Sequence, residues 1–213
     1  KLYQYLINQG FTHQGVLSNY GIILKNLGKF QEAELLYRKA IELKPDHAEA
    51  HSNLGLILKN IGKLQDAELS YRKAIELKPN YVNAYLNLGN LFIDIDKLKN
   101  AEISFRKAIE LKPDFAEAHS NLGIILKDIG KLQDAELSTR KAIEIKPDLA
   151  EAHSNLGTIL KDHGKLQDAE LSYRKAIEIK PNFANAHLNL GNILGDLGKF
   201  QEAEFALRKA IEL

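Results

Sequence analysis

The sequence predicts an all-α fold, a solenoid of stacked helix pairs. Its prolines recur at one interval of 34 residues, at Pro45, Pro79, Pro113, Pro147 and Pro181. A fixed period of this size is typical of a repeat array. Between the prolines, apolar residues recur at spacings of three and four, which indicates helices with one buried face, and no alternating strand pattern occurs.

The composition excludes several functional classes. The chain has 213 residues, of which 45% are hydrophobic and 27% charged, as in ordinary soluble domains. Lys and Arg number 29 against 28 Asp and Glu, so the basic excess of a nucleic-acid-binding protein is missing. The absence of cysteine rules out disulfides and thiolate metal sites. No apolar run approaches the ~20 residues that span a bilayer. We therefore expect no nucleic-acid partner and no membrane span. The missing cysteine and glycosylation sequons favour a cytoplasmic location.

The period divides the chain into units. We expect five full units and a truncated sixth, preceded by the tail of an earlier unit at residues 1–13. The units are 14–47, 48–81, 82–115, 116–149, 150–183 and 184–213. Because the sequence starts without Met and stops within an amphipathic stretch, we expect it to be a fragment of a longer protein.

Each unit predicts two helices. The first follows a Pro-Asp or Pro-Asn pair, and the spacing of Asp46 and Glu49 predicts a capping box, as at Asp114/Glu117 and Asp148/Glu151. A glycine such as Gly62 marks the expected left-handed stop of the first helix. The second helix is amphipathic and ends before the next proline.

The pattern resembles the tetratricopeptide repeat. Unit 2 carries its marks: Leu54, Gly55, Leu58, Gly62, Ala67, Tyr71, Ala74 and Pro79. Asp96 departs from it at the turn glycine, and Thr139 and Leu207 depart at the aromatic position of the second helix. The resemblance implies a right-handed superhelix of helix-turn-helix hairpins, with the first helices lining the concave face. Repeat arrays of this kind mostly serve as binding surfaces.

One asparagine recurs in every first helix and is not required by the repeat pattern. These residues are Asn19, Asn53, Asn87, Asn121, Asn155 and Asn189. Asparagine costs a helix interior about 0.5 kcal/mol relative to Ala. Its helical neighbours are largely polar or variable, so the side chain is expected to face the groove. An amide can bond a peptide N–H and C=O together, so a ladder of them predicts binding of an extended polypeptide through its backbone.

A similar asparagine ladder occurs in the tetratricopeptide region of O-GlcNAc transferases, where it holds substrate backbone. The stretches Ala118–Gly123 and Gly130–Ala135 are similar to that region. The resemblance implies the same role for the six asparagines. The alternative stays open that each asparagine bonds a neighbouring helix or caps a local turn, and that recent duplication copied it.

Further polar positions could add selectivity to the groove. Asp94, Asp128 and Asp162 belong to a second polar stripe that could select basic or polar peptides, or could be a solvated face. Asn90 and Asn192 are shared by units 3 and 6 only, which is either a specificity register or the trace of a three-unit duplication.

No constellation predicts catalysis, a metal site or a cofactor. His51, His119, His153 and His187 stand a full unit apart, too far to bind one ion, and Tyr85 fills the same position in unit 3. No phosphate loop, dinucleotide fingerprint or nucleophile elbow occurs. We therefore expect a non-enzymatic scaffold for a protein or extended peptide. The alternatives are the substrate-recruiting part of a larger transferase and a structural array that associates end to end through the open sixth unit.

Overall fold

The computed structural model describes residues 13–213, which form twelve α-helices and no strand. The expected tail of an earlier unit, residues 1–13, lies outside these residues except for His13. The first helices of the units are α2 (Gln14–Asn26), α4 (Ala48–Asn60), α6 (Val82–Asp94), α8 (Ala116–Asp128), α10 (Ala150–Asp162) and α12 (Ala184–Asp196). The second helices are α3 (Phe30–Leu43), α5 (Leu64–Leu77), α7 (Leu98–Leu111), α9 (Leu132–Ile145), α11 (Leu166–Ile179) and α13 (Phe200–Glu212). The predicted all-α repeat architecture is confirmed.

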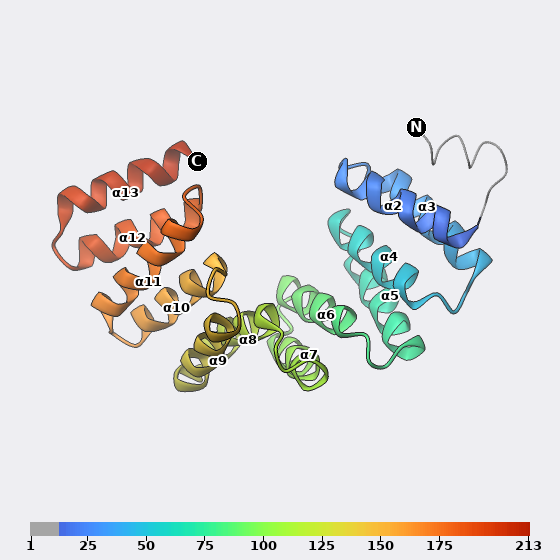
Figure 1. Cartoon of the computed structure of the whole chain (residues 1–213), viewed down its shortest axis with the longest axis horizontal. Coiled ribbons are helices and arrows are strands. Elements are labelled where there is room, and N and C mark those ends of the chain that lie inside the picture. The colour runs from blue at the N-terminus through green and yellow to red at the C-terminus, as the bar shows by residue number, and fades with distance from the viewer. Residues whose placement is uncertain (1–12) are drawn as a thin grey trace. The chain divides into compact units, whose positions relative to one another are not determined.

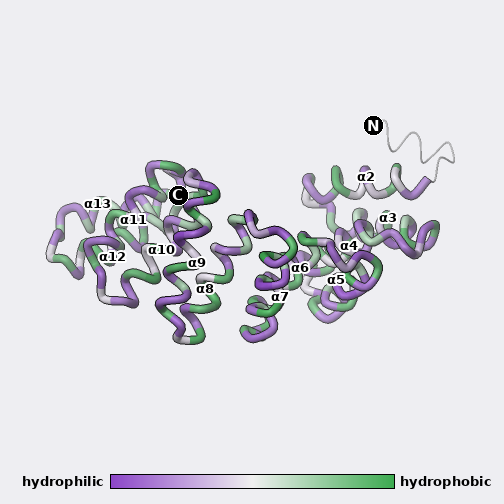
Figure 2. The backbone as a smooth tube through the Cα atoms, turned by 60° about the horizontal axis from the view of Figure 1, so that its bottom comes forward, coloured by the Kyte–Doolittle hydropathy of each residue, from purple (hydrophilic) through white to green (hydrophobic). Residues whose placement is uncertain are grey.

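The chain forms two compact parts whose boundary falls within α7, one up to Lys107 and the other from Ala108 to Leu213. Within each part, every first helix packs against the second helix of its own unit, as Gly89 of α6 does against Phe105 of α7, and, α2 and α8 apart, against the second helix of the unit before (Figure 1). Figure 2 shows polar and apolar residues alternating along each helix, as packing on one face requires.

First helices also contact one another, in the pairs α2–α4, α4–α6, α8–α10 and α10–α12. Contacts between successive second helices are sparse or absent in the described residues. The first helices are therefore the more closely spaced layer. We call the side that they line the inner face, and the side of the second helices the outer face.

The two helices of a unit meet where a glycine lies under a large side chain. A Cβ atom on Gly55 would stand 2.8 Å from the ring of Tyr71, and one on Gly157 would stand 2.8 Å from the ring of Tyr173. Both rings are buried. Tyr37, Tyr71, Phe105 and Tyr173 of the second helices are buried in the core, whereas Phe200 and Phe205 of α13 are exposed.

The predicted left-handed stops are also confirmed. Gly28, Gly62, Gly130, Gly164 and Gly198 follow the first helices with φ between +72° and +80°. Asp96 takes the same conformation in unit 3, with φ of 54°. The turn geometry therefore persists where the glycine is lost, at the conformational cost that a residue with a Cβ pays there.

The predicted capping box is wrong. α4 begins at Ala48 with His47 as its N-cap, and no side chain caps it. The reason is the turn before it, in which the His47 N–H donates to the Lys44 carbonyl and Asp46 is an inner residue. Glu49 binds Lys78 at 2.7 Å instead of reaching back to the cap. The same holds in units 4 and 5, where Glu117 pairs with Lys146 and Glu151 pairs with Lys180.

Candidate binding face

The recurring asparagines lie in the middle of the first helices, at the edge of the core. In units 2 to 6 each is half-buried, and the leucine that follows it is buried. Asn19 is exposed. These amides are therefore held by rigid helices while part of each stays accessible to a ligand.

Asn155 shows which way such an amide points. Its Nδ2 donates to the Ser120 hydroxyl at 2.9 Å, from α10 to the preceding first helix α8. Asn155 therefore lies between neighbouring first helices, on the inner face. An amide has two N–H donors and an acceptor oxygen, so this single bond leaves capacity for a ligand.

The six asparagines differ in their intramolecular partners. Asn121, like Asn155, takes part in an interaction within the protein. Among the described residues, the side chains of Asn19, Asn53, Asn87 and Asn189 form no hydrogen bond. Four amides of the row are thus open to an external partner.

The second polar stripe joins neighbouring first helices by charge. Asp94 pairs with Lys59 at 2.8 Å, and Lys127 lies 2.8 Å from Asp128 and 3.7 Å from Asp162. These carboxylates are largely neutralised by lysines of the same stripe. Asn90 interacts within the protein, and Asn192 is exposed.

The recurring histidines brace the turns between units. Nε2 of His51 lies 2.9 Å from the Pro45 carbonyl, which can only accept, so the ring donates. His119, His153 and His187 make the same bond to Pro113, Pro147 and Pro181. Residues 13–213 contain no group of three His, Cys, Asp or Glu side chains that could hold a metal ion.

Glutamates of the second helices bind lysines 29 positions later. The strongest case is Glu136, which accepts from Lys165 at 2.9 Å, His163 at 3.0 Å and Arg140 at 2.9 Å. The hydrogen bond from Lys165, together with those from Arg140 and His163, lowers the pKa of Glu136 to about 2. Within each part, such bonds tie a second helix to the turn before the next second helix.

Sequence reasoning missed one recurring surface, on the outer face. An exposed apolar residue lies at the same position of every second helix, at Leu35, Leu69, Ile103, Leu137, Leu171 and Phe205. Grooves open between successive second helices beside it, one of about 520 Å³ lined by Ile177, Leu190, Leu194 and Phe205 among others. Aligning the units would have shown an apolar residue outside the buried stripe.

Among the described residues, no helix combines the length and apolarity that crossing a bilayer requires.

Three family models match the sequence. The model of the middle TPR-like domain of cilia and flagella-associated protein 70 matches residues 24–146. Models of the TPR repeat and the tetratricopeptide repeat match residues 157–198 and 184–213. No curated protein matches the sequence of the chain.

Solved structures resemble the chain over most of its length. MamA is 30% identical with a TM-score of 0.64, and the match covers 75% of this chain and 93% of MamA. YrrB, described as a TPR protein with an unusual peptide-binding site, is 27% identical with a TM-score of 0.62, covering 83% of this chain and 91% of YrrB. A chain of the APC/C hetero-tetramer Cut9-Hcn1 shares the fold at 18% identity, with a TM-score of 0.86 over 99% of this chain and 42% of that one.

Because one of the matching models covers more than half of the sequence and all three describe the same repeat, the chain belongs to the tetratricopeptide repeat family.

Proposed function

We propose that the chain is a protein-interaction scaffold that holds an extended polypeptide on its inner face. The six expected units supply one asparagine each, and Asn53 and Asn87 carry the proposal. Each is held half-exposed on a rigid helix, and neither side chain bonds to another described residue. The peptide-binding site described for YrrB supports the same class of partner.

The spacing of the helices supports an extended ligand. Packed helices stand ~8–10 Å apart, and an extended chain advances ~3.1–3.4 Å per residue. One amide per unit then meets about every third ligand residue and bonds its backbone N–H and C=O. Such binding depends little on ligand side chains. The acidic residues Asp94, Asp128 and Asp162 and the amides Asn90 and Asn192 then bias the choice of peptide from beside the ladder.

Alanine variants test the ladder. Several unrelated unstructured peptides are selected against the chain from a displayed library, and their affinities are compared before and after Asn53→Ala and Asn87→Ala. Each substitution is expected to weaken all selected peptides, by about twofold to tenfold, because each removes backbone hydrogen bonds. Ser70→Ala is the control, since the Ser70 hydroxyl lies on the second helix α5 and donates to the Asp66 carbonyl of its own helix. Unchanged affinities, or the loss of one peptide only, contradict the ladder.

Thermal stability separates the ladder from a structural role of the asparagines. Asn53→Ala is expected to raise the stability of the free chain by about 0.5 kcal/mol, because alanine has the better helix propensity and no bond of the folded chain is lost. A structural asparagine would instead lower the melting temperature when it is replaced. Asn155→Ala serves as the comparison, because it removes the bond to Ser120.

The alternative that the chain is the substrate-recruiting part of a larger transferase rests on its resemblance to O-GlcNAc transferases in Ala118–Gly123 and Gly130–Ala135. The gene sequence that encodes the parent protein tests it, since a glycosyltransferase domain must be present. The cytoplasmic location stays a prediction in the same way, and fractionation of the source cells checks it.

A further inference from the structure

The exposed apolar residues of the second helices form a row on the outer face, which we call the outer row. It comprises Leu35, Leu69, Ile103, Leu137, Leu171 and Phe205, whose exposed fractions lie between 65% and 74%. Leu69 lies on α5, between α3 and α7, and Leu171 lies on α11, between α9 and α13. Their exposure is therefore a property of the repeat, since neighbouring units are present on both sides.

Charged residues flank the outer row in a fixed order. In α9, Asp134 precedes Leu137 by three positions and Lys141 follows it by four, so the three side chains share one face of the helix. α11 repeats the same arrangement around Leu171. Along each of these two helices the exposed face therefore runs from acidic through apolar to basic.

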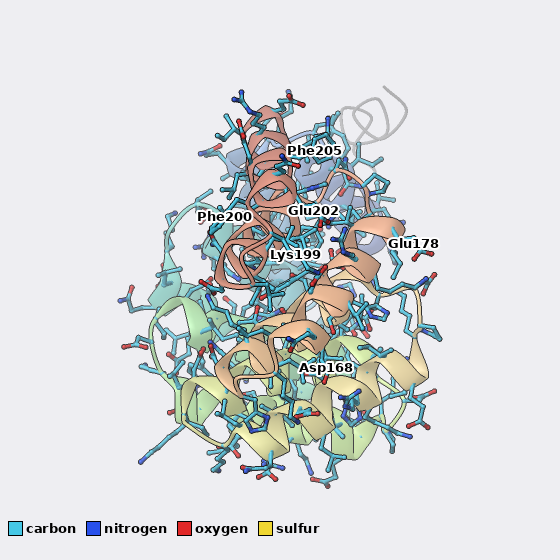
Figure 3. All side chains as sticks on the ribbon, turned by 90° about the vertical axis from the view of Figure 1, so that its left-hand side faces the viewer. Asp168, Glu178, Lys199, Phe200, Glu202 and Phe205 are labelled. Carbon is cyan, nitrogen blue, oxygen red and sulfur yellow. The ribbon has the colours of Figure 1, made fainter. Side chains whose placement is uncertain are left out.

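The acidic residue of this face has no partner in α9 or in α11. Among the described residues, the carboxylates of Asp134 and Asp168 form no hydrogen bond and no ion pair. Figure 3 shows Asp168 on α11. The lysine of each helix has one carboxylate nearby, as Lys175 has Glu178 at 2.6 Å. Since an ammonium carries three N–H donors, it can bind a second carboxylate as well.

The other second helices lack one feature or another of this arrangement. In α3 and α13 the acidic residue, Glu32 or Glu202, is already bound by a basic side chain. In α7 the position holds Asn100. Of the described second helices in the first part, α5 alone keeps the full pattern, with Asp66. α9 and α11 are therefore the neighbouring helices on which an open carboxylate and an exposed leucine recur together.

The pattern is complementary to itself when it is reversed. A rise of ~1.5 Å per residue places Asp134 about 4.5 Å before Leu137 and Lys141 about 6 Å after it. When two copies of α9 face each other in opposite directions, the leucines meet and each aspartate stands opposite a lysine. Pairing in the same direction sets aspartate against aspartate instead. The charges therefore favour an antiparallel contact between two copies of the chain.

We propose that two copies of the chain associate through the outer face of α9 and α11, about a two-fold axis that crosses these helices. Leu137 and Leu171 of each copy then pack on the same residues of the other, and the Asp134 carboxylate of one copy reaches the Lys141 ammonium of the other. Because both copies use the same patch, association stops at the dimer. The inner faces, on the side of the first helices, stay outside the contact.

Sedimentation equilibrium tests whether this dimer forms. The wild-type chain is expected to pass from monomer to dimer between micromolar and millimolar concentration and to go no further. Leu137→Ser combined with Leu171→Ser is expected to weaken the dimer by about tenfold or more, because apolar contact is lost from both copies. Leu69→Ser on α5 is the matched control, since this leucine is equally exposed, and it is expected to change little. Circular dichroism checks that the variants keep their helices.

A charge exchange tests the antiparallel pairing. One variant carries Asp134→Lys and Asp168→Lys, and the other carries Lys141→Glu and Lys175→Glu. Each variant alone sets like charges against each other, so its dimer is expected to be about tenfold weaker than the wild-type dimer. An equimolar mixture places opposite charges in every pair and is expected to form mixed dimers as strongly as the wild type does. High salt is expected to reduce these differences.

Four outcomes overturn the proposal. A wild-type chain that stays monomeric at millimolar concentration excludes the dimer. Growth beyond dimers shows that unlike surfaces meet, as in an end-to-end array. A mixture that dimerises no better than either charge variant alone contradicts the antiparallel pairing. If Leu69→Ser weakens the dimer as much as the paired substitution in α9 and α11 does, the contact lies elsewhere on the outer row.

Discussion

Thr139 stands where four other second helices carry an aromatic ring, and its hydroxyl is buried without a hydrogen-bond partner. A buried hydroxyl that bonds to nothing costs stability, because it gives up its bonds to water. Thr158 has the opposite surroundings. Its hydroxyl donates to the Ser154 carbonyl and lies 3.1 Å from the Tyr173 hydroxyl.

Valine substitutions at Thr139 and Thr158 test how much each hydroxyl contributes to stability. Thr139→Val is expected to stabilise the chain by about 1 kcal/mol, because it removes an unsatisfied polar group without changing the shape of the side chain. Thr158→Val is expected to destabilise it by a similar amount, because the Tyr173 hydroxyl loses a partner. Urea unfolding of both variants checks the two signs, and a loss of stability in Thr139→Val would show that its hydroxyl is solvated.

At the scale of the helices, the glutamate–lysine bonds act as ties between units, and Glu136 is the strongest of them. Its folded pKa of about 2 lies below the ordinary value of 4.5, so its charged form stabilises the fold. This contribution is complete above pH 4.5 and is lost as the pH falls toward 2.

Glu136→Gln is expected to lower the stability at pH 7 by about 1–3 kcal/mol and to flatten part of the acid dependence of the melting temperature. The control is Glu144→Gln in the same helix α9. Glu144 pairs with Lys141 at the surface, where its side chain is 70% exposed, so little change is expected. Equal losses in the two variants at pH 7 would contradict the assigned tie. Thermal unfolding followed by circular dichroism from pH 7 to pH 2 provides the measurement.

The helices were predictable from the sequence because their signals repeat. Gly62 and its equivalents end the first helices, and Tyr71 and its equivalents fill the space above a glycine in every unit. The N-caps of the first helices were not predictable from residue spacing alone. Asp46 lies inside the turn that follows Pro45, and the Glu49 carboxylate forms an ion pair with Lys78.

For the candidate site, the sequence was enough to predict the position of the asparagines but not their hydrogen-bond partners. Helical spacing places Asn155 beside polar positions, whereas its bond to Ser120 depends on how closely α8 and α10 approach. The exposed row that includes Leu171 was missed for a similar reason. Whether an apolar residue on a second helix is buried depends on the distance to the next second helix. That distance cannot be inferred from the sequence of one helix.

At the scale of the whole array, each unit packs mainly on its neighbours, so stability should add up unit by unit. Deleting residues 150–183 removes α10 and α11 and joins α9 to α12 at the same place in the period. α12 then meets the surface of α9 in place of the closely similar surface of α11. The shortened chain is therefore expected to fold.

The deletion variant should keep its helical content per residue and lose stability, because one unit and one interface are gone. Deletion of residues 150–166 is the matched control, since it removes α10 and the first residue of α11 and so sets two second helices in sequence. That variant lacks the inner-layer helix that separates α9 from α11, and it is expected to lose cooperative unfolding of residues 108–213. Guanidinium unfolding followed by circular dichroism distinguishes the two. If the full-unit deletion also fails to fold, the repeats depend on contacts beyond their neighbours, and the additive description of the array is wrong.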